Sequence, residues 1–269
     1  MAIVKGTIEM TGSIGNLSFY TCMGSDKVIV RTKGGANKSK IKSSPNFSGL
    51  RLQQKEWKGC TGFASVLRST FGGLQRLADY NLTAVLNGMA KNVQKRDTVH
   101  ETGKRSILFS QYRNTLEGFN FNRNYPFNSV LRVGVTATID RETLRARVSV
   151  PRINPAVDIQ NRLNLPYFRL LVALGSVSDV YYDEAVGSYE PLVPVLHGTS
   201  EVFTGEWIPS SAIIPEQTIE VCLGEEIRPY FSNEVSLILS MAIEFGKVGF
   251  TGAPEALKYA GSGKVVGSL

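Results

Sequence analysis

Histidine and cysteine, the side chains that most often act as bases, nucleophiles or metal ligands, are few in this chain. The histidines are His100 and His197, and the cysteines are Cys22, Cys60 and Cys222. None of the five stands in a CxxC, CxxH or HExxH spacing, so a zinc site lacks its usual ligand pattern. We therefore expect no metal and no cofactor, and we expect the cysteines to be buried or half-buried thiols.

Motifs for nucleophilic, acid–base or phosphate chemistry are missing as well. The G-x-S-x-G turn of serine hydrolases does not occur, although a triad that the fold builds around His197 stays an open alternative. The carboxylate pairs Asp183-Glu184 and Glu225-Glu226 are adjacent residues, which point to opposite faces of a strand or face water in a turn. Gly261-Ser-Gly-Lys-Val lacks the first glycine and the Ser or Thr of a phosphate-binding loop. The sequence predicts no enzyme and no catalytic residue.

Positive charge is concentrated in the first part of the chain. The whole chain carries a formal net charge of +7. Residues 1–123 hold 19 Lys and Arg against 7 Asp and Glu, and residues 124–269 hold 11 against 16, so the two parts carry +12 and −5. This asymmetry indicates either a basic surface for a polyanion or a basic end that meets the acidic end of another copy.

The segment between Lys27 and Lys58 is the candidate nucleic-acid interface. It contains nine Lys and Arg, with Asp26 and Glu56 as the acids beside them. Such cations bind phosphates without regard to base sequence, and they lose affinity as the salt concentration rises. Because no RNP, KH or zinc-finger signature accompanies them, nucleic-acid binding is the alternative interpretation. The candidate contacts are Lys38, Lys40, Lys42, Arg51 and Lys55.

The chain divides into three stretches that differ in the spacing of their apolar residues. These stretches must position the candidate residues named above. In the first stretch, residues 1–44, the runs 17–21 and 28–32 flank the turn signal Gly24-Ser-Asp, which predicts a hairpin. A two-stranded ribbon is only marginally stable in water, so we expect it to lie on another surface. The polar residues 36–45 are typical of a basic linker or arm.

Residues 45–121 carry apolar side chains at spacings of three and four, which predicts helices. Ser44-Pro45 is a start signal for the first helix, whose apolar stripe is expected to include Trp57. Gly59 to Gly62 is expected to break or bend that helix. A second helix is expected to carry one apolar stripe from Leu74 to Val93.

From residue 122 onward the period becomes that of strands. The run 144–150 alternates strictly, which predicts Leu144, Ala146, Val148 and Val150 inward and the arginines between them outward. Seven or eight short strands separated by Pro and Gly predict an antiparallel β-sandwich, and no helices alternate with them as a parallel sheet requires. The further runs lie at 167–174, 177–182, 201–207, 218–223, 235–245 and 264–266.

The predicted fold is therefore α+β, with an N-terminal β-ribbon arm and a helical segment before an antiparallel β-sandwich. The expected divisions are a ribbon arm with its basic linker at 1–44, a helical region at 45–121 and a β-sandwich domain at 122–269. With 42% hydrophobic and 20% charged residues the chain is typical of a folded protein. No apolar run approaches the about 18 residues of a membrane span, and the start lacks the layout of a secretory signal, so we expect synthesis in soluble form.

The N-terminus resembles a family of uncharacterised Bacteroidetes proteins known only as a domain of unknown function. The resemblance is carried by Met1-Ala-Ile-Val-Lys-Gly, Gly12-Ser-Ile-Gly-Asn-Leu-Ser-Phe-Tyr and Val28-Ile-Val-Arg-Thr-Lys-Gly-Gly, followed by helices and an antiparallel β region. It is clearest over residues 1–60. The resemblance implies a bacterial or mobile-element origin and carries over no catalytic residue.

We expect a non-enzymatic structural protein that assembles head-to-tail with copies of itself into a filament, tube or shell. The main-chain N–H and C=O groups of the arm would complete the sheet of a neighbouring copy, and unlike surfaces that do not close a ring make a filament. Glu225 and Glu226 are the expected acidic partners for Arg31 and Lys33. A monomeric carbohydrate- or protein-binding sandwich, with Trp207 or Tyr181-Tyr182 at its site, is a further alternative. The expected interface residues are Ile14, Leu17, Phe19, Val28, Val30, Arg31 and Lys33.

Overall fold

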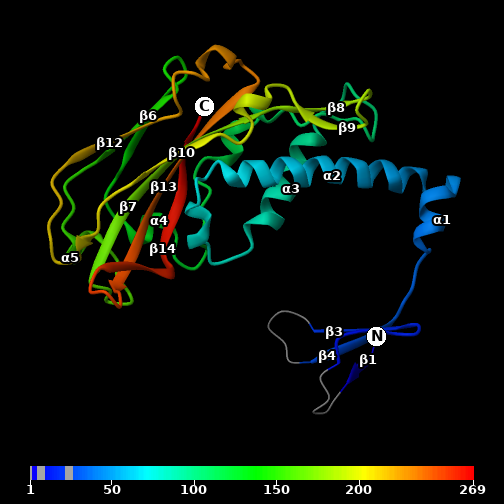
Figure 1. Ribbon diagram of the computed structural model, residues 1–269, viewed down its shortest axis with the longest axis horizontal. Coiled ribbons are helices and arrows are strands. Elements are labelled where there is room, and N and C mark those ends of the chain that lie inside the picture. Colours follow the sequence, from blue (N-terminus) through cyan, green and yellow to red (C-terminus); the bar gives the residue numbers. More distant parts are fainter. Residues whose placement is uncertain (1, 5–9, 22–26) are drawn as a thin grey trace. The chain divides into compact units, whose positions relative to one another are not determined.

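The computed structural model describes residues 2–4, 10–21 and 27–269, which group into two compact units, 1–51 and 52–269 (Figure 1). Helices occur together with sheets in which every described strand pair is antiparallel, and this confirms the α+β class. The predicted divisions at residues 44 and 121 differ from this grouping. The reason is that the helical residues share a core with the strands that follow them.

The first unit contains a four-stranded sheet in the order β1-β4-β3-β2. Its strands are β1 (Ala2–Val4), β2 (Gly12–Ile14), β3 (Leu17–Thr21) and β4 (Val28–Thr32), and they precede α1 (Lys38–Ser43) and the 3-10 turn η1 (Pro45–Phe47). The pairing of β3 with β4 matches the predicted pairing of these two runs, and β1 and β2 widen the sheet beyond two strands. The predicted turn at Gly24-Ser-Asp lies outside the described residues, as does Cys22.

The short helix α1 stands where the sequence predicted a linker. Asn37 begins it, because its side-chain oxygen accepts a hydrogen bond from the main-chain N–H of Lys40 at 2.7 Å. Arg51 closes its other end by donating to the main-chain oxygens of Ile41 and Ser44, each at 2.8 Å. Hydrogen bonds at both ends therefore hold a helix that buries no side chain.

Two sheets and a layer of helices build the second unit. The larger sheet has the order β10-β7-β13-β14 with β11 beside β7, the smaller sheet has the order β12-β6-β5, and β8 pairs with β9. The strands are β5 (Thr136–Asp140), β6 (Arg145–Val150), β7 (Tyr167–Ser178), β8 (Val180–Asp183), β9 (Ser188–Pro191), β10 (Ser200–Thr204), β11 (Ile208–Pro209), β12 (Gln217–Cys222), β13 (Val235–Val248) and β14 (Pro254–Ser268).

The helix α2 (Ser48–Ser69) starts before the boundary between the units and is followed by the other helical elements of the second unit. These are α3 (Leu82–Gln94), α4 (Phe127–Val130) and α5 (Pro155–Asp158), with the 3-10 turns η2 (Leu74–Leu77), η3 (Phe109–Gln111), η4 (Arg113–Leu116), η5 (Pro194–Leu196) and η6 (Arg228–Tyr230). Among the described helices none has both the length and the apolar character needed to cross a membrane.

The strands β7 and β13 are buried on both faces and separate two apolar cores. Leu170 and Val172 of β7 pack with the inward residues of β6 and β12, whereas Leu171 and Ala173 pack with α2 and α3. Accordingly, Figure 1 shows α2 and α3 on one side of the larger sheet and β6 and β12 on the other. A strand that is covered on both faces needs a continuous apolar run, which is what β7 and β13 have.

The strand prediction at 144–150 is confirmed in its alternation. β6 pairs with β5 and β12, and the predicted inward residues Leu144, Ala146, Val148 and Val150 are all buried. Arg147 between them is exposed. The alternation was readable because only one face of this sheet lies on the core.

The helix predictions need three corrections. α2 continues through Gly59 and Gly62, and Gly59 is there because a Cβ would stand 2.6 Å from the ring of Tyr189. Trp57 is 46% exposed and lies off the buried stripe. The predicted second helix is divided into η2 and α3, because Asn81 caps α3 through the main-chain N–H of Thr83. The buried residues of α2 are Glu56, Gly59, Cys60, Phe63, Ala64 and Leu67.

A substitution at Gly175 tests the close packing of β7 against the residue that follows α2. A Cβ at Gly175 would stand 2.4 Å from both the Cβ and the main-chain oxygen of Thr70. Because backbone must then move, we expect Gly175→Ala to lower the free energy of unfolding by about 1 to 3 kcal/mol. Thermal unfolding followed by circular dichroism measures this. Gly134→Ala is the control, since a Cβ at Gly134 meets nothing within 4 Å; equal melting temperatures for the two variants would contradict the packing.

Candidate functional site

The five apolar residues of the predicted interface lie on one face of the N-terminal sheet. The register pairs Ile14 with Leu17 and Phe19 with Val30, and opposite residues in neighbouring strands share a face. Val28 joins them because residues two apart on a strand point the same way. Ile14 is 63% exposed and Leu17 is 39% exposed, while Val28 is the only buried residue among those described in the first unit. Among the described residues, this apolar face is therefore exposed at Ile14 and Leu17 and covered at Val28.

The two predicted interface cations are engaged within their own sheet. Arg31 is on the face opposite the apolar one, with its guanidinium carbon 5.4 Å from the ring centroid of Tyr20. The Lys33 ammonium donates to the main-chain oxygen of Gly15 at 3.0 Å. Glu225, one of the expected acidic partners, already forms an ion pair at 3.3 Å inside the second unit. The geometry therefore lends no support to the predicted charge pairing.

The five predicted nucleic-acid contacts are in three different settings. Lys38, Lys40 and Lys42 are exposed on α1 and make no ion pair with any described residue. Arg51 is half-buried, and its guanidinium is bound to the α1 carbonyls. Lys55 lies on α2 with its ammonium 3.4 Å from a tyrosine ring centroid. Only the three α1 lysines are left free for a polyanion.

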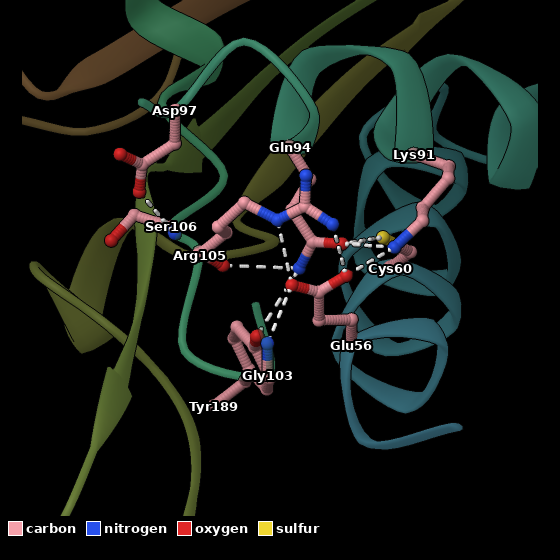
Figure 2. Close-up of polar contacts among 9 residues, drawn as sticks. All are labelled: Glu56, Cys60, Lys91, Gln94, Asp97, Gly103, Arg105, Ser106 and Tyr189. Carbon is pink, nitrogen blue, oxygen red and sulfur yellow. Dashed lines mark hydrogen bonds and ion pairs between the residues drawn. The ribbon is translucent and has the colours of Figure 1, made fainter. Parts of the chain in front are cut away.

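A buried carboxylate organises the helical layer of the second unit (Figure 2). Glu56, which the sequence presents only as an acid within the basic segment, is fully buried on α2. Its Oε1 accepts hydrogen bonds from Nε of Arg105 at 2.7 Å and from the main-chain N–H of Gly103 at 2.8 Å. Its Oε2 accepts from Nη2 of Arg105 at 2.7 Å and from Nζ of Lys91 at 2.6 Å. One carboxylate therefore ties together α2, α3 and the loop after α3.

Gln94 of α3 extends this network to the β8–β9 hairpin. Its Oε1 accepts from Nζ of Lys91 at 2.9 Å and from Sγ of Cys60 at 3.2 Å. Its Nε2 donates to the main-chain oxygen of Arg105 at 3.0 Å and to the hydroxyl of Tyr189 at 3.2 Å. All four hydrogen-bonding positions of this buried amide are thus occupied, as burial of a polar group requires.

Asp97, directly after α3, fixes the loop that carries Arg105. Its carboxylate accepts the main-chain N–H of Ser106 at 2.6 Å and that of Val99 at 2.9 Å, and it contacts Nδ1 of His100 at 2.7 Å. The loop therefore presents Arg105 and the Gly103 amide to Glu56 in a fixed arrangement (Figure 2).

The ionisation of this network is that of a structural ion pair. Burial alone raises the pKa of Glu56, but hydrogen bonds from Arg105, Gly103 and Lys91 outweigh it and lower the pKa to about 2. Burial raises the pKa of the Cys60 thiol to about 11, so the sulfur stays protonated and is a poor nucleophile. Burial likewise raises the pKa of Tyr189. The network holds charge in place and offers no reactive thiolate.

His197, the centre of the alternative triad, has no hydroxyl partner among the described residues. Its Nδ1 accepts the main-chain N–H of Ser178 at 3.3 Å, whereas the Ser178 hydroxyl donates to the main-chain oxygen of Asp179. The Asp179 carboxylate binds Ser110 through both its N–H and its hydroxyl, at 2.7 and 2.6 Å. The geometry gives the triad alternative no support.

The remaining cysteines and Trp207 have packing roles. Cys60 is buried and Cys222 is half-buried, and both are free thiols, which confirms the expectation for these two residues. Trp207 is half-buried: the Arg169 guanidinium lies 4.3 Å from its ring centroid, and Gly246 lies against its edge. One face of this indole is therefore covered by the Arg169 guanidinium.

No family model, curated protein or solved structure matches this chain. The resemblance of residues 1–60 to the Bacteroidetes family therefore stays a prediction. What the chain does must be inferred from the N-terminal sheet and from the second unit themselves.

Neutralising Glu56 tests the role of the buried network. We expect Glu56→Gln to lower the free energy of unfolding by roughly 3 to 5 kcal/mol at neutral pH, because Lys91 and Arg105 lose the charge that compensates their burial. A unit of this size should then melt roughly 6 to 20 °C lower in a thermal scan. Glu117→Gln is the matched control, since Glu117 is exposed. A Glu56→Gln protein as stable as that control would contradict the role given to the network.

The same pair of proteins should show a defined pH dependence. The pKa of Glu56 falls from its ordinary value of 4.5 to about 2 on folding, so its stabilisation is complete above the ordinary value and is lost as the pH falls towards 2. We expect the difference in melting temperature between wild type and Glu56→Gln to shrink as the pH is lowered from about 5 towards 2. A difference that stays constant over this range would show that the carboxylate charge is not the stabilising feature.

Proposed function

We propose that the protein is a non-enzymatic structural subunit that assembles with copies of itself through its N-terminal sheet. The observation that carries the proposal is the apolar face formed by Ile14, Leu17, Phe19, Val28 and Val30, on which Ile14 and Leu17 are exposed. A sheet needs a layer against one face to become stable, and the described residues of the first unit supply one buried side chain. Full burial of a Leu, Ile or Phe side chain contributes about 1.5 to 3 kcal/mol, so covering this face is strongly favoured.

The edges of the sheet support strand addition between copies. Among the described strands β2 is an edge strand that pairs with β3 alone, so its other main-chain side has hydrogen-bonding groups to offer. An added strand gains main-chain hydrogen bonds, while an apolar face gains specificity from side chains. The opposite net charges of residues 1–123 and 124–269 favour contacts between unlike surfaces, which extend into a filament, tube or shell when they do not close.

The arrangement of the second unit supports the finer fold proposal for residues 122–269. The β5–β6–β12 sheet and the strands β7 and β13 contribute side chains to one common core. Two antiparallel sheets that share such a core form a β-sandwich. In this proposal the sandwich is the body of the subunit and the N-terminal sheet is its arm.

Light scattering coupled to size-exclusion chromatography tests the assembly. We expect the full chain to form particles larger than a monomer, and Ile14→Asp combined with Leu17→Asp to shift them to monomers, because two charges would be buried at the contact. Val157→Asp is the matched control, since Val157 on α5 is 62% exposed and Ile14 is 63% exposed. Trp57 and Trp207 both lie in residues 52–269, so their fluorescence verifies the fold of the second unit in each variant.

Two outcomes of this experiment would contradict assembly through the N-terminal sheet. A full chain that stays monomeric at high concentration and low salt contradicts the proposal. Particles that keep their size in the Ile14→Asp, Leu17→Asp protein, with tryptophan fluorescence unchanged, place the contact elsewhere and contradict it as well.

Sequence-independent nucleic-acid binding is the second candidate function, favoured by the three exposed lysines of α1. A salt titration of binding to an arbitrary duplex and an arbitrary single strand tests it. If Lys38, Lys40 and Lys42 contact phosphates, their combined substitution by Gln should remove up to three counterions from the salt dependence of binding. Absence of binding at about 50 mM salt contradicts this candidate, because phosphate contacts are strongest there.

A further inference from the structure

A groove of about 310 Å³ runs between one face of α2 and the β8–β9 hairpin, entirely within the second unit. Its volume is at the lower end of the range found for small-ligand sites, about 300 to 1,000 Å³. The α2 face that borders it carries Lys55, Lys58, Gly59, Gly62 and Val66. These residues recur at spacings of three and four, so one continuous side of the helix forms the wall.

The opposite wall is aromatic and held in place. The rings of Tyr182 and Tyr189 meet edge to face with their centroids 5.4 Å apart. Tyr189 is fixed at both ends, because its ring lies against Gly59 and its hydroxyl accepts the hydrogen bond from Gln94. Figure 2 shows Tyr189 beside this buried network, which therefore orients one side of the groove.

The charged side chains among the described residues that line the groove are lysines, and His197 adds a donor. The Lys55 ammonium lies over the Tyr182 ring, and the exposed Lys58 makes no ion pair with any described residue. Nδ1 of His197 accepts the main-chain N–H of Ser178, so its Nε2 carries the hydrogen of the neutral ring and is a donor. Burial lowers the pKa of His197, which favours this neutral form.

None of the described residues that line the groove carries a carboxylate, and the acids near it have partners. Glu184 at the tip of the hairpin accepts from Lys104, although its charge also acts on Lys55. Glu190 on β9 accepts from the Ser188 hydroxyl at 2.5 Å. The ammonium of Lys58 and the Nε2–H of His197 are therefore available to a negatively charged ligand.

We propose that this groove binds a small molecule in which a planar aromatic ring carries an anionic group. The ring would contact the tyrosine wall beside the Lys55 ammonium that lies over Tyr182, and contact with an aromatic side chain contributes to affinity. The anionic group would meet Lys58, with Lys55 and the His197 Nε2–H beside it. Nucleoside monophosphates and aromatic carboxylates share this chemistry.

Calorimetric titration of the full chain with four probes tests the ligand class. Adenosine 5′-monophosphate and benzoate combine a ring with an anion, adenosine has the ring without the anion, and inorganic phosphate has the anion alone. We expect saturable binding of at least one of the first two probes, and affinity at least about tenfold weaker for the last two. The probe that binds more tightly distinguishes a phosphate-bearing ligand from a carboxylate. Failure of both combined probes to bind would overturn the proposal.

Filling the groove from Gly62 tests its location. Gly62 lines the groove and a Cβ there meets nothing within 4 Å, so Gly62→Leu adds a side chain at the groove wall, and the helix is favoured by loss of a glycine. We expect this variant to weaken probe binding at least about tenfold while thermal stability is kept or raised. Gly88→Leu on α3 is the matched control, because its Cβ also meets nothing within 4 Å and it does not line the groove. Equal weakening in both variants, or none in Gly62→Leu, would overturn the location.

Lys58→Gln provides a second variant that leaves the helix and the groove volume intact. We expect it to weaken the binding of the anionic probes roughly threefold to tenfold and to reduce the salt dependence of that binding, because one cation is lost. Weakened anion binding with unchanged affinity for adenosine supports the proposed orientation. Unchanged binding of the anionic probes would overturn it. Since the groove lies within residues 52–269, these results do not depend on assembly through the N-terminal sheet.

Discussion

The helical layer of the second unit depends on the burial of one carboxylate charge. Glu56 loses its hydration completely, and such a charge is tolerated only where opposite charges and N–H donors replace the water. Lys91 and Arg105 supply the charges, and the Gly103 amide supplies a further hydrogen bond. Because these groups come from α3 and from the loop after it, the charge can be accommodated only when all three segments are in their final places. The network therefore selects one arrangement of α2, α3 and the loop, in addition to whatever it contributes to stability.

This arrangement has consequences beyond the helices. Through Gln94 the network reaches Tyr189, and Gly59 lets the tyrosine ring approach the axis of α2. The β8–β9 hairpin is thereby held at a fixed distance from the helix, and the groove between them keeps its shape. On the other side of the layer, β7 and β13 present apolar residues to the helices and to the second sheet at once. Both faces of β7 and β13 are thus packed against other elements of this unit. Ligands or partners can therefore bind only at its outer surface.

The first unit obeys a different constraint. Its sheet is built from short strands, and the register places Ile14, Leu17, Phe19, Val28 and Val30 on one face. Among the described residues of the first unit only the side chain of Val28, in the sheet itself, is buried. The described residues of this unit therefore supply no second layer for the sheet. The first unit therefore accounts for the proposed self-assembly, whereas the groove accounts for the proposed ligand. The two proposals rest on separate surfaces.

The sequence by itself determined the features that depend on local period. It predicted the alternation in β6, because inward and outward residues follow one another along a single strand, and it predicted the pairing of β3 with β4 from a turn signal between two β-type runs. Only the tertiary structure decided which charges are buried and which glycines serve packing. Glu56 looks like an ordinary charge in a basic segment, and Gly59 looks like a helix breaker, until partners far along the chain are in place. The physical reason is that burial, hydrogen bonding and close approach are set by contacts between distant segments, which no local pattern records.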